Sequence, residues 1–375
     1  MKEKVALQDY PASHLPSRIL MGPGPSMVDP RVYQAMAAPL VGHLDPEFVH
    51  LMDRTKDLLR YTFRTDNNLT IPISGTGSAA MEASIANSVE PGSPVLVCIN
   101  GYFGERLAEM ARRYGGDVAT IHRPWGEVFT PSEVEQALKE RPAKIVGIVH
   151  AETSTGAEQP LDEIVKIVHN HGAILIVDAV TSLAGVPLSV DDLGIDICYS
   201  GTQKCISAPP GLGPITLNER AVEHLNNRKH AISSWYLDLS LVQSYWGPNR
   251  SYHHTAPITM NFALYEALRI IAEEGIENRW ARHRANSEMF WEGLAELNLK
   301  CFIPKEHRLT SLTTITVPEG VDDAAVRKGL LEDYNIEISG GLGDLKGKIW
   351  RVGLMGYTSR KENILLLLAA LKKLI

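Results

Sequence analysis

The feature that most constrains the fold is an alternation of short, fully apolar runs with amphipathic segments between residues 26 and 272. Runs such as Pro94–Ile99 and Ala173–Val177 have the length and continuous apolar character of strands that are buried on both faces. Segments such as Glu105–Tyr114 and Pro131–Glu140 have helical periodicity. The alternation predicts an α/β fold, with a mostly parallel sheet covered by helices on both faces.

The pattern changes near Glu273, where the regular alternation ends. Residues 274–297 predict one long helix that is kinked at Gly275, and the residues that follow mix strands with helices. Such a mixture is typical of a smaller α+β domain. We therefore expect an N-terminal arm over residues 1–17, a large domain over 18–273 and a small C-terminal α+β domain over 274–375.

The composition argues against several classes of protein. A net charge of −7 argues against a nucleic-acid-binding protein, whose affinity would depend on neutralising phosphates. No apolar run approaches the length of a membrane span, and no signal peptide is recognisable. The four cysteines form no CxxC pair and match no zinc spacing, so no metal site is expected: Cys98, Cys198, Cys205 and Cys301. Cys98 and Cys198 stand in apolar runs, which is typical of reduced core residues and suits a cytoplasmic protein.

Lys204 stands in a polar loop directly after an apolar run, within the string IDICYSGTQKCISAPPGLG of residues 195–213. Open α/β sheets bind ligands beyond the carboxyl ends of their strands, so this lysine is a candidate catalytic group. A free lysine, with a pKa of roughly 10.4, is a weak nucleophile at neutral pH, whereas its imine with an aldehyde cofactor is an activated electrophile. Taken alone, the pattern is better explained by a solvated surface lysine.

Asp178 ends another apolar run, in the string AILIVDAVTSL. A buried acid is costly unless a cation or hydrogen-bond donors meet it. Pyridoxal 5′-phosphate (PLP) has a ring nitrogen that such a carboxylate keeps protonated, and the protonated ring is the electron sink of its chemistry. Asp178 and Lys204 are 204 − 178 = 26 residues apart, which places them at the ends of two strands joined by one crossover. A helix cap or a metal ligand is the alternative role for Asp178.

A third string, Ser74-Gly75-Thr76-Gly77-Ser78, joins a strand-like run to a helical segment. Glycines let backbone amides approach an anion, and the helix N-terminus adds partial positive charge, so the string predicts a phosphate site. Thr76 and Ser78 can add hydroxyl groups. The string also matches a dinucleotide-binding turn, but the next strand lacks the terminal acid that a ribose needs. A plain strand-to-helix turn is the other alternative.

Arg351 lies inside the apolar run Ile349–Leu354. A buried arginine needs a carboxylate partner, and an amino-acid substrate supplies one in a bidentate geometry. A structural Asp or Glu would serve as well.

These four features together resemble the class V, fold-type I PLP-dependent aminotransferases, in particular the branch of alanine–glyoxylate and serine–pyruvate (serine–glyoxylate) aminotransferases. The resemblance extends from Met21 to Gly353 and includes strings in a fixed order: MGPGPS at 21–26, ISGTG at 73–77, ETSTG at 152–156, VDAV at 177–180, YSGTQK at 199–204 and YHHT at 252–255. It implies a fold-type I enzyme, with a sheet of the seven-stranded type in the large domain.

The resemblance implies PLP as the cofactor and a role for each matching residue. Lys204 would hold PLP as a Schiff base and carry the proton, and Asp178 would pair with the pyridinium nitrogen. The cofactor phosphate and ring would contact the remaining residues of the site: Thr76, Gly77, Ser78, Phe103, Thr153, Val180 and Gln203. Phe103 stands where relatives often have Trp, and Ser78 where some have His. Ring stacking is therefore expected to be weaker.

The resemblance also implies a substrate site and a partner. Arg351 would clamp the substrate carboxylate, Thr153 would contact the substrate, and the loop that contains Gly24 would close the pocket. Tyr252 and Thr255 would reach the phosphate of the neighbouring subunit, so we expect a homodimer with shared active sites. His253 and His254 are expected to be structural.

We therefore expect transamination of a small amino acid, alanine or serine, with glyoxylate or pyruvate as the 2-oxo acid acceptor. Two alternatives lie within class V: a phosphoserine aminotransferase, and a cysteine desulfurase, for which Cys301 is the available nucleophile. The alternatives from other classes are a nicotinamide-dependent dehydrogenase that uses Gly75–Ala80 and a binding protein without catalysis.

Overall fold

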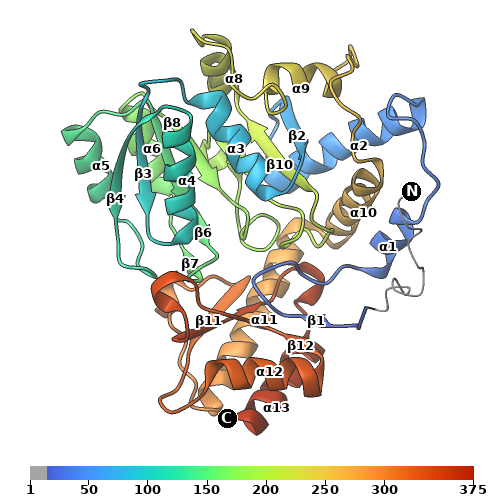
Figure 1. Cartoon of the computed structure of the whole chain (residues 1–375), viewed down its shortest axis with the longest axis vertical. Coiled ribbons are helices and arrows are strands. Elements are labelled where there is room, and N and C mark those ends of the chain that lie inside the picture. The colour runs from blue at the N-terminus through green and yellow to red at the C-terminus, as the bar shows by residue number, and fades with distance from the viewer. Residues whose placement is uncertain (1–14) are drawn as a thin grey trace, which may run out of the picture.

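A computed structural model describes residues 15–375, so most of the expected N-terminal arm lies outside the described residues. The described elements form two groups, one above the other in Figure 1. Helix α11 (Ile276–Glu296) runs from the upper group into the lower one. No described helix combines the length and the apolar character that crossing a membrane requires.

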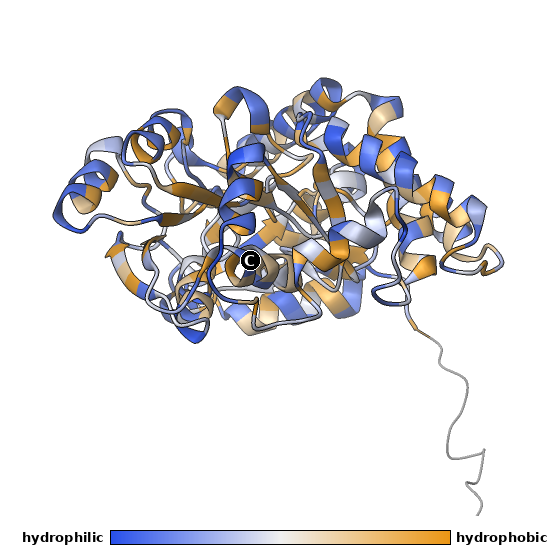
Figure 2. Ribbon diagram, turned by 90° about the horizontal axis from the view of Figure 1, so that it is seen from above, coloured by the Kyte–Doolittle hydropathy of each residue, from blue (hydrophilic) through white to orange (hydrophobic). Residues whose placement is uncertain are grey.

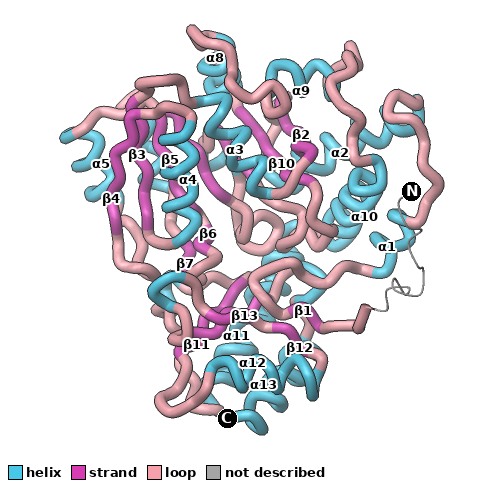
Figure 3. The backbone as a smooth tube through the Cα atoms, in the orientation of Figure 1, coloured by secondary structure: helices cyan, strands magenta, loops and turns pink. Residues whose placement is uncertain are grey.

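A seven-stranded sheet forms the centre of the upper group (Figure 3). Its strands lie in the order β2 (Leu69–Ser74), β10 (Leu212–Leu217), β9 (Ile197–Tyr199), β8 (Ile174–Asp178), β5 (Ile145–Val149), β3 (Pro94–Ile99) and β4 (Asp117–His122). Neighbouring strands from β9 to β4 are parallel, whereas β10 is antiparallel to both β2 and β9. The expected mostly parallel sheet is therefore confirmed, with one antiparallel strand next to its edge.

Successive residues of a strand face opposite sides of the sheet, which creates two apolar cores. In β3, Val95 and Val97 pack with α3 and α4, whereas Leu96 and Cys98 pack on the opposite face with α5 and α6. Figure 2 shows the hydrophobic strands at the centre and hydrophilic stretches on the surrounding helices. The helices of this group are α1 (Pro30–Met36), α2 (Pro46–Phe63), α3 (Gly77–Ser88), α4 (Tyr102–Arg113), α5 (Pro131–Glu140), α6 (Asp162–Asn170), α7 (Val190–Leu193), α8 (Glu219–Asn226), α9 (Leu239–Trp246) and α10 (Ile258–Glu274).

The lower group contains a three-stranded sheet and two further helices, which pack with the second half of α11. Its elements are β11 (Leu312–Thr316), α12 (Asp323–Tyr334), β12 (Ile336–Glu337), β13 (Ser339–Gly340), β14 (Ile349–Gly353) and α13 (Lys361–Leu374). The short strand β1 (Ile19–Leu20) pairs with β12, and Met21 belongs to the core of this group. The segment that begins at residue 18 therefore packs with the C-terminal elements, while the domain boundaries stay a prediction.

The expected helix over residues 274–297 is confirmed as α11, and it differs only at its start, where the helix is interrupted at Gly275 and not merely kinked. Helix α10 continues to Glu274, and α11 begins at Ile276. Between them Gly275 has a φ of 84°, a left-handed conformation that favours glycine and interrupts the helix. The strands at 94–99 and 349–353 and the helices at 131–140 and 361–374 have the expected bounds.

Candidate active site

The candidate site lies at the carboxyl ends of β8 and β9, which are neighbours in the sheet. Asp178 is the last residue of β8 and is paired in register with Tyr199, the last residue of β9. Lys204 follows β9 after a loop of four residues, 200–203. Because parallel strands end at the same edge of the sheet, the two predicted groups face one place in the fold.

Lys204 is buried, with 9% of its surface exposed. Its Nζ donates a hydrogen bond to the carbonyl oxygen of Pro23, and a Cβ atom on Gly24 would lie 2.6 Å from Lys204 Cδ. Burial, and then the positive charge of Arg351, lower the pKa of Lys204 to about 8. A larger fraction of free amine is therefore present near neutral pH, and the free amine is the form that attacks an aldehyde.

Asp178 is held by two donors. The backbone amide of Val180 donates to Oδ1 at 2.8 Å, and the Tyr199 hydroxyl donates to Oδ2 at 2.9 Å. Burial raises the pKa of Asp178 to about 6, although both hydrogen bonds oppose the shift. Each carboxylate oxygen accepts more than one hydrogen bond, so the group can still accept one from a protonated ring nitrogen.

The start of α3 has the chemistry of a phosphate cup. Thr76, at the N-cap position, makes no side-chain capping hydrogen bond, so the partial positive charge of the helix end stays available. A Cβ atom on Gly77 would lie 3.3 Å from Gly201 Cα, so a side chain here would press against the loop that leads to Lys204. The buried Oε1 atom of Gln203 has no partner among the described residues. These features fit a bound phosphate.

Arg351 lies in β14 and is 6% exposed. Its Nε donates to the carbonyl oxygen of Gly340 at 2.8 Å and its Nη1 to that of Thr153 at 3.2 Å. In the described part of the chain Arg351 has no carboxylate within ion-pair distance, so the alternative of a structural Asp or Glu partner is not supported. Burial lowers the pKa of Arg351 to about 10, although the charge of Glu152 opposes the shift.

The residues expected to contact the cofactor ring lie near the end of β8 and the start of α4. The Thr153 hydroxyl is hydrogen-bonded to that of Thr181, in the loop after Asp178. Phe103 and Val180 are both half-buried. The backbone amide of Phe103 donates to the carboxyl of the fully buried Glu152 at 3.2 Å.

Tyr252 and Thr255 do not join this cluster within one chain. Both side chains are exposed, and the Tyr252 ring lies 5.2 Å from the ring of His43. Between them, His253 stacks on Trp235 at 4.2 Å, and His254 Nε2 lies 2.6 Å from Ser74 Oγ at the end of β2. The segment thus runs beside the phosphate cup, with Tyr252 and Thr255 directed outward.

The family profile of class V aminotransferases matches residues 20–362. This chain is a class V aminotransferase. It is 41% identical to the alanine–glyoxylate aminotransferase of Rattus norvegicus over 93% of this chain and 85% of the rat protein. It is 40% identical to the (S)-ureidoglycine–glyoxylate transaminase of Bacillus subtilis over 96% of this chain and 91% of that protein.

Solved structures agree with this assignment. The crystal structure of an alanine–glyoxylate aminotransferase from Nostoc sp. has a TM-score of 0.97 and 51% identity, covering 99% of this chain and 100% of that one. A phosphoserine aminotransferase and a cysteine desulfurase match at 21% and 16% identity, which shows a shared fold alone. The aminotransferase therefore has fold-type I and uses PLP.

Several groups around the site were not recognised in the sequence. Tyr199 ends the strand next to that of Asp178 and is paired with it in register, so its position at the end of an apolar run could have indicated that it lies beside Asp178. The carbonyl oxygen of Pro23 is 181 residues away from Lys204 along the chain, so no local pattern indicates their contact. In the sequence, Glu152 stands out only as part of the ETSTG string at 152–156. Its burial raises its pKa to about 7.

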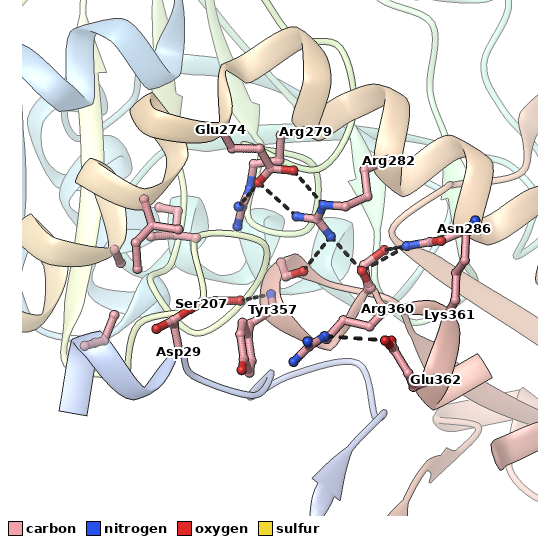
Figure 4. Close-up of a pocket in the computed structure, with 16 residues that line it drawn as sticks. Asp29, Ser207, Glu274, Arg279, Arg282, Asn286, Tyr357, Arg360, Lys361 and Glu362 are labelled. Atoms are coloured by element: carbon pink, nitrogen blue, oxygen red, sulfur yellow. Dashed lines mark hydrogen bonds and ion pairs between the residues drawn. The ribbon is translucent and has the colours of Figure 1, made fainter. Parts of the chain in front are cut away.

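A cavity of about 400 Å³ lies beside the loop that carries Lys204 (Figure 4). On one side of this cavity, the Glu274 carboxylate accepts hydrogen bonds from Arg279 Nη1 at 2.8 Å and from Arg282 Nε at 2.6 Å. Arg279 also donates to the carbonyl oxygen of Cys205 at 2.7 Å, and Arg282 to that of Ser359 at 2.7 Å. This charge cluster of the aminotransferase connects the α10–α11 junction to the Lys204 loop and to the turn before α13.

Proposed function

We propose that this aminotransferase transfers the amino group of a small amino acid, alanine or serine, to glyoxylate, with pyruvate as an alternative acceptor. The observation that carries the proposal is the convergence of Lys204, Asp178 and Arg351 on one buried site. Glyoxylate appears in the names of the relatives from rat, Bacillus subtilis and Nostoc sp., whereas the named donors differ. The acceptor therefore has broader support than the donor.

The proposed cofactor contacts follow from the positions of the side chains. When bound, PLP supplies the electron sink that stabilises negative charge at the substrate Cα. Lys204 Nζ would attach the cofactor and then move the proton, and Asp178 would keep the ring nitrogen protonated. Phe103 and Val180 would contact the two ring faces and Thr153 the ring hydroxyl. The phosphate would be bound by the loop and helix end at the cup: Thr76, Gly77, Ser78 and Gln203.

The proposed substrate is small because of the segment opposite Lys204. The guanidinium of Arg351 would bind the substrate carboxylate, with Thr153 beside it. A Cβ atom on Gly24 would lie 2.6 Å from Lys204 Cδ, so even one added carbon atom would overlap the Lys204 side chain. A site with so little clearance favours the methyl group of alanine or the hydroxymethyl group of serine over a longer side chain.

We also propose a homodimer, in which Tyr252 and Thr255 complete the phosphate site of the partner subunit. Supporting it, the surface beside the cup exposes three large aromatic side chains: Trp235 at 60%, Tyr236 at 44% and Tyr252 at 62%. Such clusters are unusual on a surface that faces only water and are enriched at interfaces.

The four free cysteines support the proposed cytoplasmic location, where thiols stay reduced.

The proposal is tested by half-reactions of the purified holoenzyme. Alanine, serine, glutamate and aspartate are each mixed with it in single turnovers, and the loss of the visible PLP absorbance is followed. Glyoxylate, pyruvate and 2-oxoglutarate are then offered to the aminated enzyme. We expect alanine or serine, and glyoxylate, to react fastest. A preference for glutamate and 2-oxoglutarate would refute the proposed substrates, though not the aminotransferase activity.

Lys204→Ala provides the matching test of the site. We expect turnover to vanish, together with the chromophore that borohydride reduces, because no other amine replaces Nζ. Retention of both would contradict the role of Lys204.

A second candidate donor, (S)-ureidoglycine, is favoured by the relative from Bacillus subtilis at 40% identity. It belongs in the same screen as a further donor. A single-turnover rate well above those of alanine and serine would replace the proposed donor and leave glyoxylate as the acceptor.

A further inference from the structure

We propose that Arg106 is an additional binding residue for the cofactor phosphate, acting together with the N-terminus of α3. Arg106 is not among the residues that the resemblance assigns to the site. The inference rests on the proposed function, because it concerns the phosphate that Gly77, Ser78 and Gln203 would bind.

The first argument is the charge balance of the cup. A phosphate ester carries about −1.5 to −2 charges at pH 7. The proposed phosphate ligands within this chain are all uncharged: Thr76, Gly77, Ser78 and Gln203. The helix end contributes roughly half a positive charge. An anion that is partly removed from water needs a cation nearby, and the uncharged ligands supply none.

The second argument is position. Arg106 lies in the first half of α4, and its Nη1 donates a hydrogen bond to Ser78 Oγ at 3.2 Å. Ser78 is the second residue of α3. The guanidinium is therefore held at the helix end where an anion binds. Its charge also reaches the reacting groups, because it contributes to the lowered pKa of Lys204 and opposes the raised pKa of Asp178.

The third argument is availability. In the described part of the chain, no carboxylate lies within ion-pair distance of Arg106. Glu109, one turn further along α4, pairs instead with Arg113 at 2.8 Å. The guanidinium rests on two aromatic rings, 4.9 Å from the centre of Phe103 and 5.2 Å from that of Tyr102. Contact with a ring face leaves guanidinium N–H groups in the plane free to donate to phosphate oxygens.

The contact with Phe103 also places Arg106 near the cofactor ring, because Phe103 is the proposed stacking partner of that ring. Pyridoxal has the same ring but lacks the phosphate ester, so it would offer the guanidinium of Arg106 no anion. The two aldehydes therefore separate a contribution of Arg106 to the phosphate site from one to the ring site.

The test compares PLP with pyridoxal. The full chain is freed of cofactor by dialysis and titrated with each aldehyde, and binding is followed by absorbance. For Arg106→Gln we expect the Kd of PLP to rise about 10-fold to 100-fold, the range for losing a hydrogen bond to a charged group. The Kd of pyridoxal should stay the same. Arg106→Lys, which keeps the charge but not the planar fork, should weaken PLP binding less.

Arg112→Gln is the matched control, because it removes the same charge from an exposed position of the same helix. Inorganic phosphate gives a second readout, since it should compete with PLP less effectively in Arg106→Gln than in the wild type. Equal PLP affinities of Arg106→Gln and Arg112→Gln would overturn the inference. So would equal losses for PLP and pyridoxal, which would indicate a disturbed ring site. A wild-type chain that binds neither aldehyde would instead refute the proposed function.

Discussion

At the scale of single residues, the site contains two buried groups whose pKa values are shifted towards each other. Burial lowers the pKa of Lys204 to about 8 and raises that of Asp178 to about 6. Between these values Asp178 is ionised, as pairing with a ring nitrogen requires, while a useful fraction of Lys204 is free amine. Burial, the largest cause of both shifts, therefore favours a working range around neutral pH.

Arg351 is expected to lower the pKa of Lys204 as well as to bind the substrate. Its positive charge lowers the pKa of Lys204, so Arg351→Gln should raise that pKa. The rate at which cofactor-free protein takes up PLP should increase with pH, with a midpoint near 8 in the wild type. The midpoint should move to higher pH in the variant. Stopped-flow absorbance measures these rates, and Arg327→Gln, whose side chain pairs with Asp323, is the control. An unchanged midpoint in Arg351→Gln would contradict this effect.

Asp178 is expected to reduce the stability of the cofactor-free protein at neutral pH. Its pKa in the folded state is above its ordinary value of 3.8, so folding favours the protonated acid, and this contribution to stability is lost as the pH rises through about 6. Asp178→Asn should therefore stabilise the cofactor-free protein at pH 8 by roughly 1–3 kcal/mol. The gain should be absent at pH 4, and activity should be lost.

Denaturant unfolding of the cofactor-free variant and wild type at the two pH values measures this difference. A variant that is destabilised equally at both would indicate that the lost hydrogen bond from Val180 or Tyr199 outweighs the removed charge.

At the scale of elements, the charge cluster of Glu274, Arg279 and Arg282 holds together parts that are distant in sequence. Glu274→Gln would leave the two arginines without their anion, and Arg279 is 3% exposed. Breaking such a buried pair costs about 3–5 kcal/mol. We expect a clearly lower Tm and looser attachment of PLP, because Arg279 also holds the carbonyl oxygen of Cys205 beside Lys204.

The control is Glu277→Gln in α11, which breaks an exposed ion pair with Arg64, the C-cap residue of α2. Pairs of that kind contribute about 0–1 kcal/mol. Thermal unfolding measures the Tm of both holoenzyme variants, and dilution measures their rates of PLP release. Equal Tm values for the two variants would show that the cluster has no special role.

Elements whose apolar residues follow one period could be predicted from the sequence, whereas elements that depend on tertiary contacts could not. The strand β3 and helix α5 have the expected bounds because their apolar residues follow one period without interruption. The sequence does not predict the strand β10 (LGPITL), because Gly213 and Pro214 disfavour a central strand. The sheet accommodates Pro214 opposite Pro72 of β2, a pairing that only the register reveals.

The same distinction applies to the candidate site. Lys204 and Asp178 could be predicted to lie close together because Asp178 ends one apolar strand, Lys204 follows the next strand after a short loop, and the crossover between the strands is short. Arg106 could not, since its partner Ser78 is 28 residues away along the chain and an arginine on an amphipathic helix has no distinctive local pattern. Gly24 was placed near the substrate by resemblance alone, and its contact with Lys204 depends on the whole fold.

At the scale of the whole molecule, the N-terminal segment joins the two groups of elements. Met21 packs in the lower core and its carbonyl oxygen accepts from the Gly353 amide, while Pro23 contacts Lys204 in the upper group. The segment thus lies between the proposed cofactor lysine and the strand that carries Arg351. We propose that the domain boundary lies at Gly275 and that this segment couples the positions of the two domains to the size of the substrate site.

The proposed homodimer predicts complementation between two inactive variants. Lys204→Ala lacks the cofactor amine but keeps Tyr252 and Thr255. The double variant Tyr252→Phe and Thr255→Val keeps the amine but loses the hydroxyl groups that would reach the partner's phosphate. If these hydroxyls act across the interface, a mixed dimer has one complete site, formed by Lys204 of one subunit and the hydroxyls of the other. Unfolding and refolding an equal mixture should then yield activity above that of either parent refolded alone.

The control for the mixing experiment is Lys204→Ala refolded with Asp178→Asn. These two residues belong to the same chain's site, so every mixed dimer has a defect in both sites and no activity should return. Light scattering on the refolded material measures the oligomeric state independently. Complementation would be absent if Tyr252 and Thr255 acted within their own chain, because the mixed dimer would then contain one site without Lys204 and another without the hydroxyls. A monomer by light scattering would exclude the shared site outright, and the exposed rings of Trp235 and Tyr252 would then need another partner.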